Sequence, residues 1–105
     1  MEDERLIFGL ARRHYLDLAR VFDKYPKIER VLIFGSRAKG VEKPYSDIDL
    51  AVIAPNMEDT EFARVLSDLD ELELVFKLDV LHLDRLTQQK LKETVLAHGK
   101  AFYPL

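Results

Sequence analysis

Apolar residues recur at helical spacing near the start of the chain. Side chains such as Ile7 and Leu18 fall on one face of residues 4–24, and charged residues fall mostly between them. This pattern predicts an amphipathic helix over the whole segment. Asp3 is a candidate cap, and Pro26 ends the helix because the residue before a proline disfavours helical backbone.

Two further segments have the same spacing. Residues 59–73 predict a second amphipathic helix, whose exposed face is acidic, and residues 86–98 predict a third. Asp84 has the side chain of a helix cap, and Gly99 stands where a helix often ends. The chain is therefore expected to contain three main helices.

Four runs between and after these helices predict strands. Arg30–Phe34 is β-branched and aromatic, residues 48–54 are apolar on both faces, and residues 76–83 and 101–103 complete the set. Helices and strands in this order predict an α+β domain, in which a small mixed sheet is packed by about three helices in two layers. We expect residues 1–105 to form this single domain.

The composition is that of an ordinary globular protein. Of 105 residues, 48% are hydrophobic and 33% are charged, and the net charge of −3 argues against direct binding of nucleic acid. The absence of cysteine excludes disulfides, and no apolar run approaches the roughly 20 residues of a membrane span. The acidic start does not fit a signal peptide, so the cytoplasm is the expected location. Composition leaves the formation of homo-oligomers open.

Two aspartates stand at the start of the second predicted strand. Because residues two apart on a strand share a face, Asp47 and Asp49 lie side by side and repel each other unless a cation lies between them. Oxygen ligands favour Mg²⁺, with Mn²⁺ as an alternative. The competing interpretation is a pair of solvent-facing aspartates, and spacing alone does not decide between the two.

A third aspartate changes this balance. Asp79 lies inside an apolar run, where an isolated carboxylate is costly to bury. If its strand pairs with residues 48–54, Asp79 joins Asp47 and Asp49 in a triad that could hold two metal ions, as suits phosphoryl or nucleotidyl transfer. The alternative is a charge at a strand edge, paired with Lys77.

A glycine and a serine follow the first predicted strand. Gly35 would let the backbone approach a ligand closely, and Ser36 would open a short helical turn whose amides can hold phosphate oxygens. Arg37 and Lys39 add positive charge nearby and are expected to bind the nucleotide together with Gly35 and Ser36. A polar loop over residues 40–45 follows. The segment is not a P-loop, because GxxxxGK[ST] is absent.

GSRAKG, followed by SDIDL and by a lone aspartate in a later strand, resembles the nucleotidyltransferase superfamily related to DNA polymerase beta. More narrowly, nearly the whole chain is similar to small stand-alone MNT-type (minimal nucleotidyltransferase) proteins. The resemblance implies the nucleotidyltransferase fold, contacts from Gly35 and Ser36 to a nucleoside triphosphate, and metal binding by Asp47 and Asp49. It also implies that Asp79 completes the site near the attacking hydroxyl.

The same resemblance implies a reaction and a partner. Such proteins resemble the antitoxin half of a two-gene system whose partner is a helical HEPN-type toxin, and the implied reaction moves AMP from ATP to a tyrosine of that partner. The position of Lys39 is more often arginine in this family, and lysine keeps the charge but loses the bidentate fork.

The length of the chain bears on the acceptor. Since 105 residues leave nothing for an acceptor-binding domain, the acceptor is expected on another molecule or on a second copy. Two alternatives remain: a non-catalytic nucleotide-binding subunit of a complex, and a nucleotidyltransferase acting on a small molecule such as a drug or a sugar.

Overall fold

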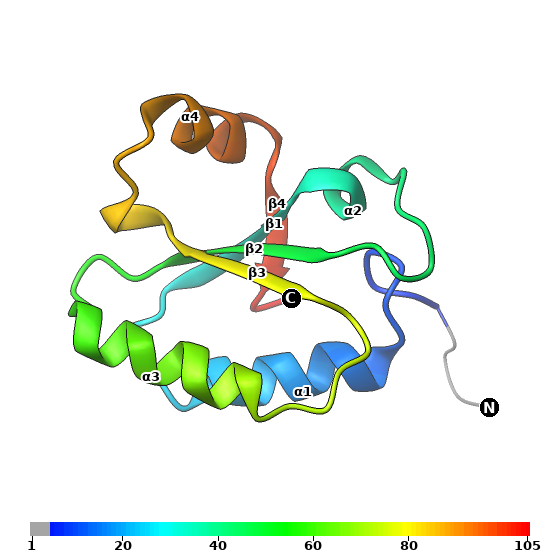
Figure 1. Cartoon of the computed structure of the whole chain (residues 1–105), viewed down its shortest axis with the longest axis horizontal. Helices are drawn as coiled ribbons and strands as arrows, with labels where there is room; N and C mark the ends of the chain where they lie inside the picture. Colours follow the sequence, from blue (N-terminus) through cyan, green and yellow to red (C-terminus); the bar gives the residue numbers. More distant parts are fainter. Residues whose placement is uncertain (1–4) are drawn as a thin grey trace.

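Four strands form one mixed sheet in the order β3-β2-β1-β4 (Figure 1). The computed structural model describes residues 5–105 of the chain. The strands are β1 (Arg30–Phe34), β2 (Ile48–Ile53), β3 (Leu78–His82) and β4 (Lys100–Tyr103). β1 is antiparallel to both of its neighbours, whereas β3 runs parallel to β2. The parallel pair is connected through a helix, as parallel strands require.

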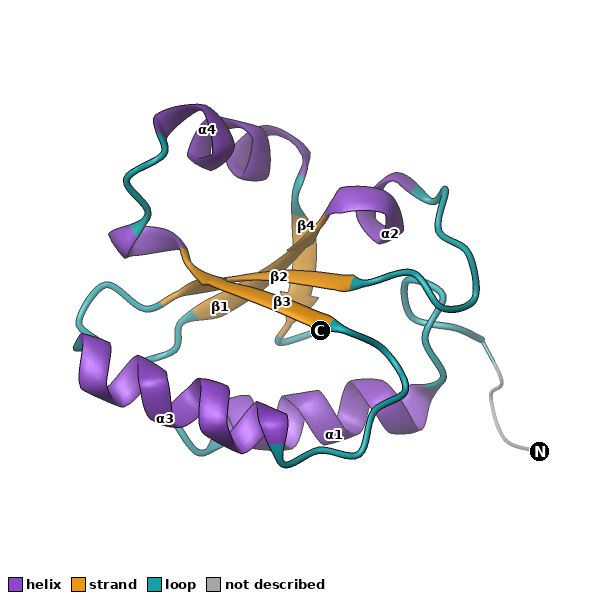
Figure 2. Cartoon of the chain, in the orientation of Figure 1, coloured by secondary structure: helices purple, strands orange, loops and turns teal. Residues whose placement is uncertain are grey.

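Helices cover both faces of the sheet (Figure 2). They are α1 (Arg12–Asp23), α2 (Gly35–Lys39), α3 (Asp59–Asp70), the short 3₁₀ turn η1 (Leu83–Arg85) and α4 (Gln89–His98). α1 and α3 lie side by side across one face, and α4 lies over the other. The predicted α+β class is therefore confirmed. Within residues 5–105, no helix combines the length and the hydrophobicity that crossing a bilayer requires.

The alternation of side chains along β2 separates two apolar clusters. Ile48, Leu50 and Val52 point to the main core beneath α1 and α3, where all three are fully buried. Ala51 faces the opposite way, into a smaller cluster with Val95 of α4. Both faces of β2 are covered, which explains why its sequence is a continuous apolar run. Asp49, the second residue of β2, is the polar residue that interrupts this run.

The first helix is shorter than predicted. It begins at Arg12 and not at residue 4, because the chain before it makes a tight turn in which Ile7 and Leu10 bond each other's backbone. The two residues between them have positive φ, 51° at Phe8 and 78° at Gly9, as a two-residue hairpin turn requires. The predicted cap Asp3 lies outside the described residues.

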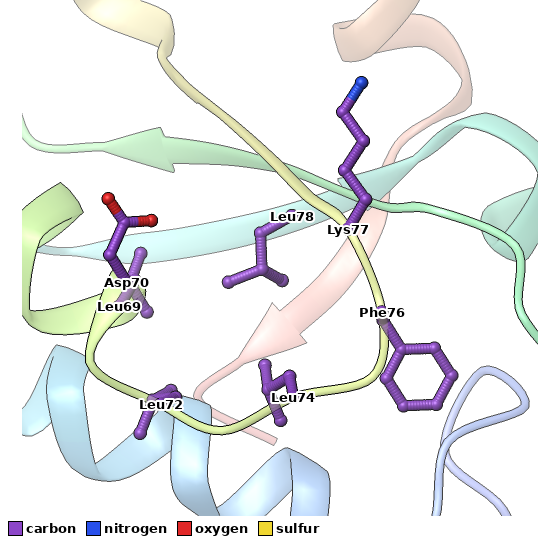
Figure 3. A pocket seen from close by; sticks show the side chains of 7 residues that line it. All are labelled: Leu69, Asp70, Leu72, Leu74, Phe76, Lys77 and Leu78. Atoms are coloured by element: carbon purple, nitrogen blue, oxygen red, sulfur yellow. The ribbon is translucent and has the colours of Figure 1, made fainter.

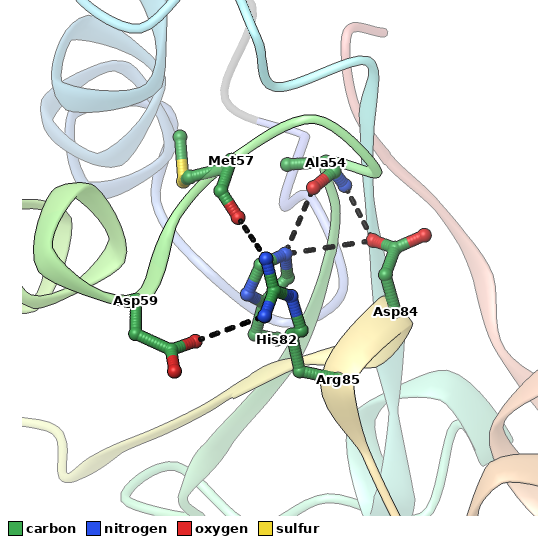
Figure 4. A network of polar contacts seen from close by, with 6 residues as sticks. All are labelled: Ala54, Met57, Asp59, His82, Asp84 and Arg85. Carbon is green, nitrogen blue, oxygen red and sulfur yellow. Dashed lines mark hydrogen bonds and ion pairs between the residues drawn. The ribbon is translucent and has the colours of Figure 1, made fainter.

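The prediction that Asp84 caps the last helix is wrong. Asp84 lies in η1, and α4 begins only at Gln89. The Asp84 carboxylate instead accepts a hydrogen bond of 2.7 Å from the backbone amide of Ala54, just beyond β2 (Figure 4). An aspartate satisfies whichever unpaired amide lies nearest, and here that amide comes from another part of the chain.

Other predicted boundaries shift slightly. The second helix ends at Asp70 and not at residue 73, and the third strand is limited to Leu78–His82. The strands predicted over Arg30–Phe34 and near residues 48–54 and 101–103 are all present.

Candidate active site

Strand pairing brings two of the predicted aspartates together. Asp49 and Asp79 are direct Cα partners in the parallel ladder between β2 and β3. Both lie on the face opposite α1 and α3, because their neighbours Leu50 and Val80 point into the main core. The condition on which the carboxylate triad depended, that the strand of Asp79 pairs with that of Asp49, is therefore met.

The antiparallel direction of β1 brings the glycine turn to the same edge. Phe34, the last residue of β1, pairs with Asp49. Gly35 follows with φ of 73°, and a Cβ placed on it would overlap the Asp49 carboxylate oxygen Oδ2. A side chain at position 35 is therefore disfavoured for two reasons. The backbone conformation is one that glycine adopts most easily, and a Cβ would collide with the Asp49 carboxylate. Ser36 comes next, half-buried, in the first turn of α2.

Three carboxylates place negative charge close together at this edge of the sheet. Burial is the largest cause that raises the pKa of Asp49, and the carboxylates of Asp79 and Asp47 raise it further. Arg37 and Lys77 lower it, but they do not reverse the shift. Burial and neighbouring negative charge therefore outweigh the effect of the two cations on Asp49.

Lys77, which the sequence did not assign to the site, is a basic residue near the carboxylates. The sequence suggests it only as an alternative ion-pair partner of Asp79. It lies close enough to Asp49 to lower the pKa of that carboxyl, and its own carbonyl accepts a bond from the amide of Ile48. The available signal was the two-residue spacing between Lys77 and Asp79, which places both on one face of an extended segment.

The residues present fit a divalent cation held together with a nucleotide. Within residues 5–105, no three His, Cys, Asp or Glu side chains gather closely enough to form a metal cage by themselves. Mg²⁺ does not require one, because it commonly takes one or two carboxylates and completes its shell with water and substrate phosphates. Asp47 and Asp49 are the residues that would hold it, beside Asp79.

The structure separates the two predicted basic residues. Lys39 is exposed in the last turn of α2. Arg37 is only 2% exposed, and its guanidinium donates to the backbone carbonyls of Phe8, Pro44 and Ser46. Direct contact between Arg37 and a triphosphate would require this loop to move.

A pocket near these elements lies on the other face of the sheet. A cavity of about 300 Å³ lies where the chain passes from α3 to β3, and it is lined mainly by apolar side chains such as Leu72, Leu74 and Leu78 (Figure 3). The side chain of Lys77 extends away from them. Since Leu78 and Asp79 alternate along β3, this pocket lies behind the carboxylates and not among them.

A model of the polymerase beta nucleotidyltransferase family matches residues 17–104. The chain belongs to this family. The match spans both the glycine turn and all three aspartates, and it confirms the resemblance drawn from GSRAKG and SDIDL. No curated protein sequence matches this nucleotidyltransferase.

Solved structures share its fold. A toxin–antitoxin structure with AMP-PNP contains a chain that is 24% identical, with a TM-score of 0.67, over 85% of this nucleotidyltransferase and 72% of that chain. A mutant of the MntA–HpeT toxin–antitoxin complex gives 27% identity and a TM-score of 0.63 over 88% and 71%. A third similar structure is the tri-AMPylated Shewanella oneidensis HEPN toxin in complex with MNT antitoxin, at 21% identity and a TM-score of 0.57 over 88% and 71%. The nucleotidyltransferase fold is thus confirmed, while the roles of individual residues stay predictions.

Proposed function

We propose that this nucleotidyltransferase moves AMP from ATP to a hydroxyl group of a partner protein. The observation that carries the proposal is the meeting of Asp49 and Asp79 in adjacent parallel strands, at the edge where the Gly35–Ser36 turn begins α2. Carboxylates on one side and a close-approach glycine turn on the other suit a triphosphate bound with a divalent cation.

Each residue has a proposed task in the reaction. Ser36 and the amides after Gly35 hold the triphosphate, and Lys39 adds positive charge beside it. Asp47 and Asp49 hold Mg²⁺, as two ions or with Mn²⁺ in their place, which would neutralise charge on the phosphates.

The chemical step is an in-line displacement. The acceptor oxygen bonds to the α-phosphorus, the bond from that phosphorus to the bridging oxygen breaks, and pyrophosphate leaves with the electron pair. Asp79 assists by taking the acceptor's proton. This carboxylate is exposed on the edge strand β3, which leaves room for an acceptor to approach.

The proposed acceptor is a tyrosine of a helical HEPN-type toxin encoded by a neighbouring gene, and the modification would silence that toxin. Support comes from the MNT-type motifs and from similar chains in toxin–antitoxin structures, one of which contains an AMPylated HEPN toxin. On this proposal the protein is an antitoxin that works in the cytoplasm, where ATP is available.

The test is transfer of label to the partner. The protein is incubated with Mg²⁺, the partner and ATP labelled either at the α- or at the γ-phosphate. Label should reach the partner only from the α-position, and Asp47→Asn should lower the rate about 10³-fold through lost charge stabilisation in the transition state. Asp70→Asn, which alters an exposed aspartate at the end of α3, is the matched control and should transfer normally.

Two other outcomes would replace the proposal. A tight complex without transfer, unchanged by Asp47→Asn, would make the protein a non-catalytic binding subunit. Label found on a small molecule when no partner is present would make it a small-molecule nucleotidyltransferase.

A further inference from the structure

Arg37 is the most deeply buried charged side chain in the part of the chain that the structure describes, at 2% exposed. Its guanidinium makes four hydrogen bonds to backbone carbonyls, and none of the acceptors is charged. A buried charge is costly unless its donors are satisfied, so these carbonyls must be held in place for the fold to tolerate Arg37. These hydrogen bonds therefore hold the backbone carbonyls in position as well as the Arg37 side chain.

Two of the carbonyls belong to the loop that carries the first aspartate. Nε and Nη2 of Arg37 both donate to the Ser46 carbonyl, at 3.2 and 2.9 Å, and Nη2 also lies 3.5 Å from the Pro44 carbonyl. The Ser46 carbonyl belongs to the peptide bond that joins Ser46 to Asp47. Arg37 therefore holds the backbone immediately before Asp47 through hydrogen bonds.

The loop also has contacts of its own. The amide of Lys43 donates to Ser46 Oγ at 2.8 Å, and the amide of Ser46 donates to the Lys43 carbonyl at 3.0 Å. These bonds close a compact turn, but they do not tie it to the sheet. Among the hydrogen bonds of the described residues, those from Arg37 connect this turn to the helix that follows β1.

The other side of the guanidinium is enclosed. Nη1 donates to the Phe8 carbonyl at 3.0 Å, and the Phe76 ring lies 5.1 Å from Arg37 Cζ. A Cβ on Gly9 would come within 2.8 Å of Nη1. The N-terminal turn thus closes over Arg37, and its glycine leaves the space that the guanidinium occupies.

We propose that Arg37 is a positioning residue, which acts through the Ser46 carbonyl to hold Asp47 beside Asp49. The inference rests on the proposed function, since it gives Asp47 a metal to bind. It replaces the predicted contact between Arg37 and the nucleotide with an indirect role. The same anchor explains why an arginine is needed, because the single ammonium of a lysine cannot span three carbonyls in a planar fork.

The first measurement needs neither metal nor substrate. In Arg37→Lys and Arg37→Met, amide hydrogen exchange at Lys43 and Ser46 should quicken at least tenfold, while exchange within β1 and β2 stays slow. Val65→Ala, which removes fully buried methyl groups on the inner face of α3, is the matched control. It should lower the melting temperature but leave exchange in the loop unchanged.

The second measurement is Mn²⁺ binding, followed through the electron paramagnetic resonance signal of the free ion. Both Arg37 variants should bind Mn²⁺ about 10- to 100-fold more weakly than the wild type, the usual cost of losing a group that orients metal ligands. Arg37→Lys should fail to restore binding although it keeps the charge. Gly9→Ala, which crowds the guanidinium without removing it, should weaken binding in the same direction.

The outcomes separate this proposal from the proposed function. Unchanged exchange at Ser46 in a folded Arg37→Met, or normal Mn²⁺ binding by Arg37→Lys, would overturn the positioning role. If the wild type itself bound no Mn²⁺ and transferred no label, the proposed function would fail, and the exchange data would still decide whether Arg37 anchors the loop. A variant with intact Mn²⁺ binding and a raised KM for ATP alone would return Arg37 to direct nucleotide contact.

Discussion

The two ends of the parallel pair β2 and β3 differ in how their polar groups are satisfied. At the end where both strands begin, Asp49 faces Asp79, and burial together with neighbouring carboxylates raises the pKa of Asp49. At the other end, Ala54, His82 and Asp84 form a network whose main bonds are made within the protein (Figure 4). The first end presents negative charge that an outside cation can neutralise. At the second end Asp84 and Nε2 of His82 pair with the Ala54 backbone, and among the described residues only Nδ1 of His82 is a buried side-chain atom without a hydrogen-bond partner.

The network at the second end is built around backbone groups. Nε2 of His82 donates to the Ala54 carbonyl at 2.9 Å, and Asp84 accepts from the Ala54 amide. The Phe62 ring stacks on His82 with 4.8 Å between centroids, and Arg85 reaches the Met57 carbonyl at 3.3 Å. These contacts hold the end of β2 against η1. We infer that this end serves the fold, and that the carboxylate end serves the ligand.

The sharpest test of this difference is ligand binding. Mg²⁺ with a non-hydrolysable ATP analogue should raise the free energy of unfolding by about 2.7 kcal/mol at a hundredfold excess over Kd. The increase should be lost in Asp49→Asn and kept in Asp84→Ala, because only the first residue lies at the carboxylate end. Thermal unfolding with ligand and with chelator measures it, and equal shifts in both variants would remove the distinction between the two ends.

The second test removes the network. Asp84→Ala leaves the buried Ala54 amide without its acceptor and should lower the free energy of unfolding by about 1–3 kcal/mol. The control is Asp59→Ala, which breaks a surface ion pair of 3.9 Å with Arg85 and removes one acidic side chain from the first turn of α3. It should change stability by less than about 1 kcal/mol. Urea unfolding compares the two. Label transfer by folded Asp84→Ala should remain near the wild-type rate.

The smallest effect concerns the apo protein and pH. Because the pKa of Asp49 is raised on folding, its proton favours the folded state below the unfolded pKa, and this contribution is lost as pH rises through the folded pKa. Asparagine does not titrate. Asp49→Asn should therefore be slightly more stable than the wild type at neutral pH, and the gain should fade as the pH falls to the ordinary range of an aspartate pKa.

Urea unfolding in the presence of chelator, repeated across this pH range, measures the difference. Asp70→Asn serves again as the control for replacing an exposed aspartate with asparagine. A loss of stability in Asp49→Asn at neutral pH would mean that the carboxylate is already satisfied within the protein.

The pairing of Asp49 with Asp79 could be anticipated from the sequence because the signals for it lie within short segments of the chain. A two-residue period assigns the faces of a strand, and a carboxylate in an apolar run is unusual enough to stand out. Gly35 was recognised for a similar reason, since a glycine directly after a buried strand indicates close backbone approach. The strands themselves followed from their apolar runs.

Two residues have contacts that the sequence does not indicate, because their partners are backbone groups. Asp84 has the side chain of a helix cap, but it accepts a hydrogen bond from the amide of Ala54. Arg37 is predicted to bind the nucleotide, and in this structure its guanidinium donates to backbone carbonyls. Every residue has a backbone carbonyl and nearly every residue has a backbone amide. The sequence therefore does not indicate which backbone group will be the hydrogen-bond partner of a given side chain. The tight turn at Phe8 also lies outside the sequence prediction, which extended the first helix through it; the Phe8 carbonyl accepts a hydrogen bond from Arg37.

The parallel pairing of β2 with β3 also has a consequence for when the protein can act. Asp49 and Asp79 are separated in sequence by the whole of α3, so neither local segment contains both of these aspartates. Non-local strand pairing of this kind forms late, because the intervening chain must first be closed into a loop. A chain still leaving the ribosome, or one opened by damage, would keep its glycine turn and lose its ability to transfer nucleotide. Activity would then report that the β2–α3–β3 unit is fully assembled.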